Sequence, residues 1–172
     1  PCGLAHRRLS IIDIAHGQQP MDTADGRYAI AYNGEVYNYL DLRGELEALG
    51  RTFTTDSDTE VVLQAFAQWG ADAFDRFNGM FGLAIWDREE KRLTLARDHF
   101  GIKPVYVARV PAPSGGGEVL LFASEIKPIL ASGLYEKKVN ERSVYRYLRF
   151  RAHEDGTETE IEVAVAGRVM LM

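Results

Sequence analysis

The sequence is poor in cysteine: Cys2 stands alone. One cysteine cannot form a disulfide within the chain, which suits a reducing, cytoplasmic compartment. No apolar run approaches the roughly 20 residues of a membrane-spanning helix, and the first residues do not have the pattern of a secretory signal.

Basic residues are fewer than acidic ones, since 20 Lys and Arg against 25 Asp and Glu give a net charge of −5. This balance argues against nucleic acid or an anionic membrane as a partner.

Motifs for metals and phosphates are scarce as well. The four histidines are scattered singly, without the spacing of a metal site. The glycine run 115–117 follows Pro113 and Ser114 and precedes an apolar stretch, which is typical of a flexible hairpin tip rather than a phosphate-binding loop. We therefore expect no metal and no cofactor in this chain.

What is present is the composition of an ordinary globular domain. The 172 residues are 46% apolar and 26% charged, and this length is enough for one domain with a sizeable core. Period-2 apolar stretches predict strands near 4–14, 28–32, 80–86, 93–97, 105–110 and 119–123. Helical spacing predicts helices near 42–49, 57–69, 71–77, 124–131 and 140–150.

Local signals sharpen some of these boundaries. Gly50 is placed where the first helix would stop. Ser57, with Glu60 three residues later, predicts a capping box at the start of the second helix. Short connections favour an antiparallel meander with a hairpin at residues 87–92, and therefore an α+β fold. The expected core comprises Leu4, Ile11, Ile30, Val62, Phe66, Phe81, Leu83, Ile85, Leu95 and Phe122.

Two segments contain polar residues that the fold alone would not require. In His6–Asp13, Arg8 has the side chain suited to binding a carboxylate, although this segment alone is more simply a solvated strand edge. In Tyr32–Asn38, the pair Asn33 and Gly34 is most simply a turn. Their alternative role is to donate the Asn33 amide and the Gly34 N–H to an oxyanion, with Glu35 beside them as an anionic partner for an amine.

Two further segments have simpler structural explanations. Asp58, in Thr55–Glu60, is favourable at a helix start because of the helix dipole. In Arg97–Pro104, Asp98 and His99 are adjacent on an extended chain and point to opposite faces, so we interpret this segment as a structured turn rather than a base with its orienting group.

Six blocks together resemble the N-terminal glutaminase domain of glutamine-dependent asparagine synthetases, a class II (N-terminal nucleophile, or Ntn) glutamine amidotransferase. They are HRRLSIID, YNGEVYN, TDSDTEV, NGMFGLAIWD, LARDHFGIKPVY and FASEIKPIL, collinear from Leu4 to about Leu130 with a weaker match through 147–150. The resemblance implies a four-layer αββα sandwich of antiparallel sheets that hydrolyses glutamine to glutamate and ammonia.

The same resemblance implies roles for individual residues. Arg8, with the Ile12 backbone nearby, matches the group that holds the glutamine α-carboxylate. Asn33 and Gly34 match the oxyanion-hole donors. Glu35 and Asp58 match the groups around the α-ammonium. Glutamine is therefore the expected ligand of the chain, and a homodimer is a possible assembly.

The start of the chain departs from the family pattern. Relatives begin with a Cys-Gly whose thiolate attacks the amide and whose α-amine acts as base, a few dozen residues before the HRRL block. Here Cys2 lies directly before that block, and we expect that it is not the nucleophile. We therefore expect a chain that lacks its first strands and is inactive alone, with residues 1–150 as a partial amidotransferase domain. Residues 151–172 would be a remnant of the segment toward a synthetase domain.

The resemblance places ATP and Mg²⁺ in that absent synthetase domain. In the full protein, glutamine, aspartate and ATP would give asparagine, glutamate, AMP and pyrophosphate. Two alternatives stay open at this point. One is a non-catalytic amino-acid-binding or scaffold module of the same fold. The other is the amidotransferase domain of a related enzyme, such as a β-lactam synthetase.

Overall fold

A computed structural model of the protein describes residues 2–7, 17–150, 162–163 and 170–171. These residues form two compact units, which are described separately. The first unit contains the described residues up to Lys103 together with residues 170–171, and the second contains those from Pro104 to Val163.

The first unit is built on an antiparallel sheet. Its strands are β1 (Met21–Asp22), β2 (Tyr28–Val36), β3 (Gly79–Asp87), β4 (Arg92–Arg97) and β8 (Met170–Leu171), in the order β1-β2-β3-β4-β8. The longest pairing joins β2 to β3 in a register that places Tyr28 opposite Asp87 and Val36 opposite Gly79. The predicted hairpin between β3 and β4 is confirmed, and Asp87 closes its turn by accepting from the backbone N–H groups of Glu89 and Glu90.

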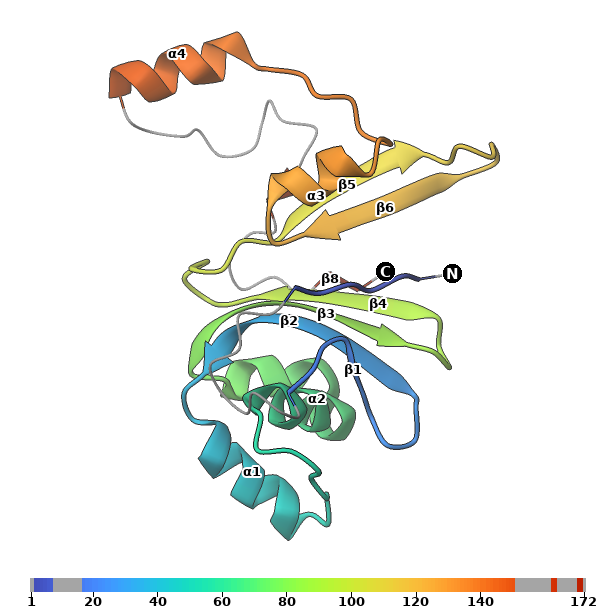
Figure 1. Ribbon diagram of the computed structural model, residues 1–172. Helices are drawn as coiled ribbons and strands as arrows, with labels where there is room; N and C mark the ends of the chain where they lie inside the picture. The colour runs from blue at the N-terminus through green and yellow to red at the C-terminus, as the bar shows by residue number, and fades with distance from the viewer. Residues whose placement is uncertain (1, 8–16, 151–161, 164–169, 172) are drawn as a thin grey trace. The chain divides into compact units, whose positions relative to one another are not determined.

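Three helical segments cover one face of this sheet (Figure 1). They are α1 (Tyr39–Ala48), α2 (Asp58–Trp69) and the 3₁₀ helix η1 (Gly70–Arg76). The predicted stop of α1 is confirmed, because Gly50 follows it with φ +87°, a conformation that costs glycine little. None of the described helices has the length and apolar composition needed to cross a bilayer.

The start of α2 confirms Ser57 as the N-cap but not the predicted capping box. The Ser57 hydroxyl accepts from the Thr59 N–H at 3.2 Å, which satisfies one of the open donors of the first turn. Glu60 does not reach back to Ser57 and instead binds the backbone N–H groups and hydroxyls of Thr54 and Thr55. The reciprocal bond is replaced because the preceding loop offers this carboxylate four donors at once.

The core of the first unit lies between the sheet and its helices. Most of the expected core residues are buried there or within the sheet: Ile30, Val62, Phe66, Phe81, Leu83, Ile85 and Leu95. Leu4 and Phe122 are only half-buried, and Ile11 lies outside the described residues. The strand predicted from residue 4 is wrong for residues 4–7, which pair with no strand, and the rest of it lies outside the described residues.

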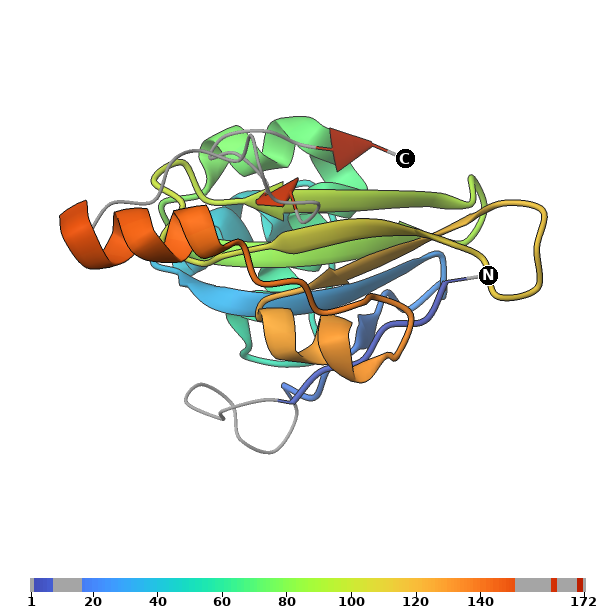
Figure 2. The same cartoon turned by 90° about the horizontal axis from the view of Figure 1, so that it is seen from above.

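The second unit consists of a hairpin with two helices. Its strands β5 (Tyr106–Pro111), β6 (Glu118–Ala123) and β7 (Glu162–Val163) are antiparallel in the order β6-β5-β7, and its helices are α3 (Ile126–Ala131) and α4 (Glu141–Phe150). The β5–β6 hairpin is seen from above in Figure 2. The glycine run forms its tip, as predicted, with Gly115 and Gly116 at positive φ. Since every strand pairing among the described residues is antiparallel, the α+β class is confirmed.

A structured turn follows β4, as the sequence predicts. The buried carboxylate of Asp98 accepts from the backbone N–H groups of Phe81, Phe100, Ile102 and Lys103 at 2.9–3.2 Å. Burial alone would raise the pKa of Asp98, but these four donors outweigh it and hold the pKa below its usual range. The Asp98 carboxylate therefore holds the turn against β3, and the Arg97 guanidinium also donates to the Gly101 and Lys103 carbonyls within the turn.

The predicted turn at Asn33 and Gly34 is wrong. Both residues lie inside β2, paired with Gly82 and Phe81 of β3, and neither has the positive φ of an Asn-Gly turn. Gly34 is needed for a different reason. A Cβ on it would lie 2.2 Å from the Met80 carbonyl oxygen, so only glycine allows the two strands to approach this closely.

We expect Phe66→Ala to lower the free energy of unfolding by about 3–5 kcal/mol. Phe66 is 4% exposed, and its ring packs edge-on against Tyr28 and beside Phe74. The matched control is Phe100→Ala, because Phe100 is 88% exposed and its loss should change stability by less than about 0.5 kcal/mol. Urea unfolding measures both. A loss below about 1 kcal/mol for Phe66→Ala would contradict the packing of α2 on the sheet.

We expect Gly34→Ala to destabilise the protein by about 1–3 kcal/mol or more, because the new methyl group has no room against β3. Gly44→Ala is the matched control. Gly44 lies within α1 with nothing near its Cβ position, and alanine there should stabilise the helix by about 0.5–1 kcal/mol. Thermal unfolding distinguishes the two signs, and a Gly34→Ala variant as stable as the wild type would refute the β2–β3 register.

Candidate active site

The pairing of β2 with β3 determines which backbone N–H groups of β2 point away from β3, toward what we call the outer edge of β2. The Phe81 N–H donates to the Asp98 carboxylate, and the Phe81 carbonyl accepts from the Asp98 N–H at 2.8 Å. Both polar backbone groups of Phe81 therefore point toward β4. In an antiparallel ladder its partner Gly34 is then a non-hydrogen-bonded residue, so the Gly34 N–H points away from β3 toward the outer edge of β2.

The neighbouring outward N–H groups support this geometry. The Tyr32 N–H donates to Gln19 Oε1 at 2.6 Å, and the Val36 N–H donates to Asp58 Oδ2 at 3.3 Å. Gly34 lies midway between them and has the same orientation, because backbone directions repeat every two residues along a strand. Among the residues that the structure describes, no acceptor binds the Gly34 N–H. The edge thus presents one available donor between two occupied ones.

Asp58 connects this edge to the start of α2. It is 6% exposed, and its Oδ2 accepts from the Tyr32 hydroxyl at 2.8 Å as well as from the Val36 N–H. Burial, followed by the charge of Asp58, raises the pKa of the Tyr32 phenol, so this hydroxyl keeps its proton and remains a donor. The carboxylate therefore lies against the stretch of β2 that contains Asn33 and Gly34.

A second link joins the same elements. The Gln19 side chain accepts from the Tyr32 N–H and donates its amide to the Thr59 hydroxyl at 3.3 Å. One amide group thus bridges the edge of β2 and the first turn of α2. Together with the Asp58 contacts, it fixes the helix start against the strand.

Asn33 and Glu35 occupy the opposite face of β2 from Tyr32 and Val36. The last two belong to the core under the helices, and successive strand residues alternate between faces. Asn33 and Glu35 are half-buried on the face that points away from the helices.

The structure therefore brings four of the predicted site residues to one stretch of β2. Asn33, Gly34 and Glu35 belong to the strand, and Asp58 reaches it at Val36. Arg8 and Ile12 lie outside the described residues, so their predicted place in the site stays a prediction.

Sequence reasoning missed Tyr32 and Gln19. Both act through contacts that are distant in sequence, since Tyr32 is 26 residues from Asp58 and Gln19 is 40 residues from Thr59. One signal was available for Tyr32. A tyrosine in an apolar strand directly before a polar motif needs a partner for its hydroxyl once it is buried.

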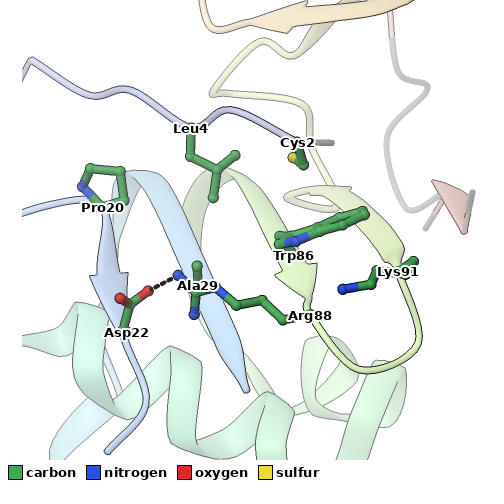
Figure 3. A pocket seen from close by; sticks show the side chains of 8 residues that line it. All are labelled: Cys2, Leu4, Pro20, Asp22, Ala29, Trp86, Arg88 and Lys91. Carbon is green, nitrogen blue, oxygen red and sulfur yellow. Dashed lines mark hydrogen bonds and ion pairs between the residues drawn. The ribbon is translucent and has the colours of Figure 1, made fainter. Parts of the chain in front are cut away.

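A cavity of about 610 Å³ lies at another part of the sheet (Figure 3). It is lined by Cys2, Leu4, Pro20, Asp22, Ala29, Trp86, Arg88 and Lys91. Arg88 and Asp22 form an ion pair at its edge, with 2.8 Å between nitrogen and oxygen. Burial raises the pKa of the Cys2 thiol, which disfavours the reactive thiolate.

The position of Cys2 separates it from Asn33. Cys2 shares the cavity with Ala29, and Ala29 is four residues, or about 13 Å, from Asn33 along β2. The described residues contain no group of His, Cys, Asp and Glu side chains arranged to hold a metal ion.

Comparison with known proteins gives a consistent result. The glutamine amidotransferase domain family matches residues 1–171. Asparagine synthetase [glutamine-hydrolyzing] 1 of Bacillus subtilis is 40% identical over 149 residues, which are 87% of this chain and 22% of the relative. Asparagine synthetase [glutamine-hydrolyzing] 3 of the same organism is 46% identical over 128 residues, 73% of this chain and 20% of the relative. The chain thus spans about a fifth of the length of these relatives.

Solved structures share the fold. Glutamine phosphoribosylpyrophosphate amidotransferase from B. subtilis aligns with a TM-score of 0.54 and 24% identity, over 67% of this chain and 26% of that one. A structure described as the allosteric regulatory enzyme of purine biosynthesis aligns with a TM-score of 0.55 and 24% identity, over 70% of this chain and 27% of that one. With the family match over nearly the whole length, the chain belongs to the glutamine amidotransferase domain family.

Proposed function

We propose that this chain is the glutamine-binding part of the glutaminase domain of an asparagine synthetase. The observation that carries the proposal is the outer edge of β2, where the Gly34 N–H is available and the buried Asp58 carboxylate lies close by. The similarity to asparagine synthetases along most of the chain supports the choice of enzyme. The reaction of the complete protein, in which aspartate and ATP also take part, belongs to the proposal.

Glutamine hydrolysis requires a charge arrangement that fits these residues. Free glutamine has an ammonium and a carboxylate at one end, so it needs anionic and cationic partners there. Glu35 and Asp58 are proposed to bind the α-ammonium. Arg8, with the Ile12 backbone, is proposed to bind the α-carboxylate.

Hydrolysis at the amide end of glutamine needs hydrogen-bond donors to the amide oxygen. When a nucleophile attacks the side-chain amide, its oxygen gains negative charge in a tetrahedral intermediate. The Gly34 N–H and the Asn33 side-chain amide are proposed to donate to that oxygen. A donor held by a paired strand is pre-organised, and one such donor commonly contributes a factor of roughly 10²–10³ to the rate.

The nucleophile is not assigned to Cys2. The β2 residue that lines its cavity, Ala29, is about 13 Å along the strand from Asn33, and burial raises the pKa of the Cys2 thiol. The ammonia released would pass to a synthetase domain, and ATP with Mg²⁺ would act there rather than in this chain. Binding of glutamine, and not its turnover, is therefore the measurement suited to this chain.

We expect the chain to bind L-glutamine in a calorimetric titration and Asp58→Asn to weaken that binding about tenfold or more. The substitution keeps the shape of the side chain but removes the charge that attracts the ammonium. Asp56→Asn is the matched control, because its side chain is 94% exposed and it lies two residues upstream. A wild-type chain that does not bind glutamine, or equal affinities for the two variants, would contradict the proposal.

A further inference from the structure

Resting on the proposed function, we propose that Tyr32 is a positioning residue for the α-ammonium of glutamine, acting through the Asp58 carboxylate. Tyr32 touches neither the amide nor the reacting atoms in this account. Its role is to hold Asp58 in the one orientation in which the carboxylate faces β2.

The contact that carries the inference is short and enclosed. The Tyr32 hydroxyl donates to Asp58 Oδ2 at 2.8 Å, and the two residues are 3% and 6% exposed. The tyrosine ring belongs to the core cluster under the helices. Because a buried ring in a close-packed core has one rotamer available, the hydroxyl is a fixed point rather than an adaptable one.

Asp58 has alternative hydrogen-bond partners within its own helix. As the first residue of α2, its carboxylate could turn to the open N–H groups of its own helix, which commonly bind acidic side chains. Ser57 already accepts from the Thr59 N–H, so the helix has a cap that is not Asp58. The Tyr32 hydroxyl and the Val36 N–H instead draw Oδ2 across to β2.

The location of Tyr32 couples the two ends of the ligand site. It directly precedes Asn33 in β2, and its own N–H is held by Gln19. A shift of this residue would move both the Asp58 carboxylate and the start of the Asn33–Gly34 pair. The raised pKa of the phenol, which comes from burial and then from Asp58, keeps the hydroxyl protonated and able to donate.

The test compares two ligands that differ only at the ammonium. L-Glutamine carries it, whereas glutaramate (5-amino-5-oxopentanoate) keeps the carboxylate and the amide but lacks the amine. We expect Tyr32→Phe to raise the dissociation constant for L-glutamine about tenfold, the effect of one hydrogen bond to a charged group. The same variant should bind glutaramate as the wild type does. Calorimetric titration of the full chain measures both affinities.

Tyr28→Phe is the matched control. Tyr28 lies on the same strand and packs against the same core, but its hydroxyl makes no hydrogen bond with the described residues. This variant should bind both ligands normally. In an Asp58→Asn background, Tyr32→Phe should cause little further loss for L-glutamine, because two residues that act as one unit are not additive.

The outcomes separate this inference from the proposed function. If the wild-type chain does not bind L-glutamine, both fail. If it binds and Tyr32→Phe leaves the affinity unchanged, or weakens both ligands equally, Tyr32 has no positioning role while the proposed function stands. An additive double variant would likewise overturn the inference.

Discussion

A buried carboxylate lowers the stability of a fold unless hydrogen-bond donors surround it. The first unit must therefore supply donors to Asp58. Its side chain is removed from water at the start of α2. An unpaired carboxylate there would lower the free energy of unfolding by several kcal/mol. The Tyr32 hydroxyl and the Val36 N–H supply donors from the adjacent strand. The helix start and the strand edge are therefore fixed together, and the site residues on β2 inherit that arrangement.

Backbone geometry completes the arrangement. Asp98 binds both polar backbone groups of Phe81 on the β4 side, because its carboxylate accepts from the Phe81 N–H and its own N–H donates to the Phe81 carbonyl. The opposing Gly34 therefore directs its N–H to the outer edge. The close approach of β2 and β3 at Gly34 excludes any side chain there. The Asp98 carboxylate on one side of the β2–β3 pair, with Asp58 and the Gln19 amide on the other, thus determines which N–H groups of β2 are occupied and which one is available.

Local sequence signals predicted much of this fold. The end of α1 at Gly50, the Ser57 cap and the hairpin after β3 depend on contacts within a few residues, and all three are confirmed. The turn predicted at Asn33 and Gly34 was wrong because the pairing of β2 with β3 overrides a local preference. No local pattern could have indicated that Gly34 faces the Met80 carbonyl, since that contact depends on register between distant segments.

The candidate site could be predicted only in part, because some of its contacts join residues that are distant in sequence. The chemistry of its motif indicated Glu35, and family resemblance indicated Asp58, but the hydrogen bond from Tyr32 to Asp58 spans 26 residues and has no signature in the chain. Glu60 shows the converse, since its motif indicated a capping box while the loop before the helix offered it better donors. Family resemblance assigned Arg8 and Ile12 a role, and both lie outside the described residues.

The edge of β2 presents one available N–H donor between two occupied ones, and amide hydrogen exchange tests this arrangement most directly. In the free chain, the Tyr32 and Val36 amides should be strongly protected, while the Gly34 amide between them exchanges at least about tenfold faster because no described group accepts from it. Protection of the Gly34 amide equal to that of its two neighbours would contradict the account.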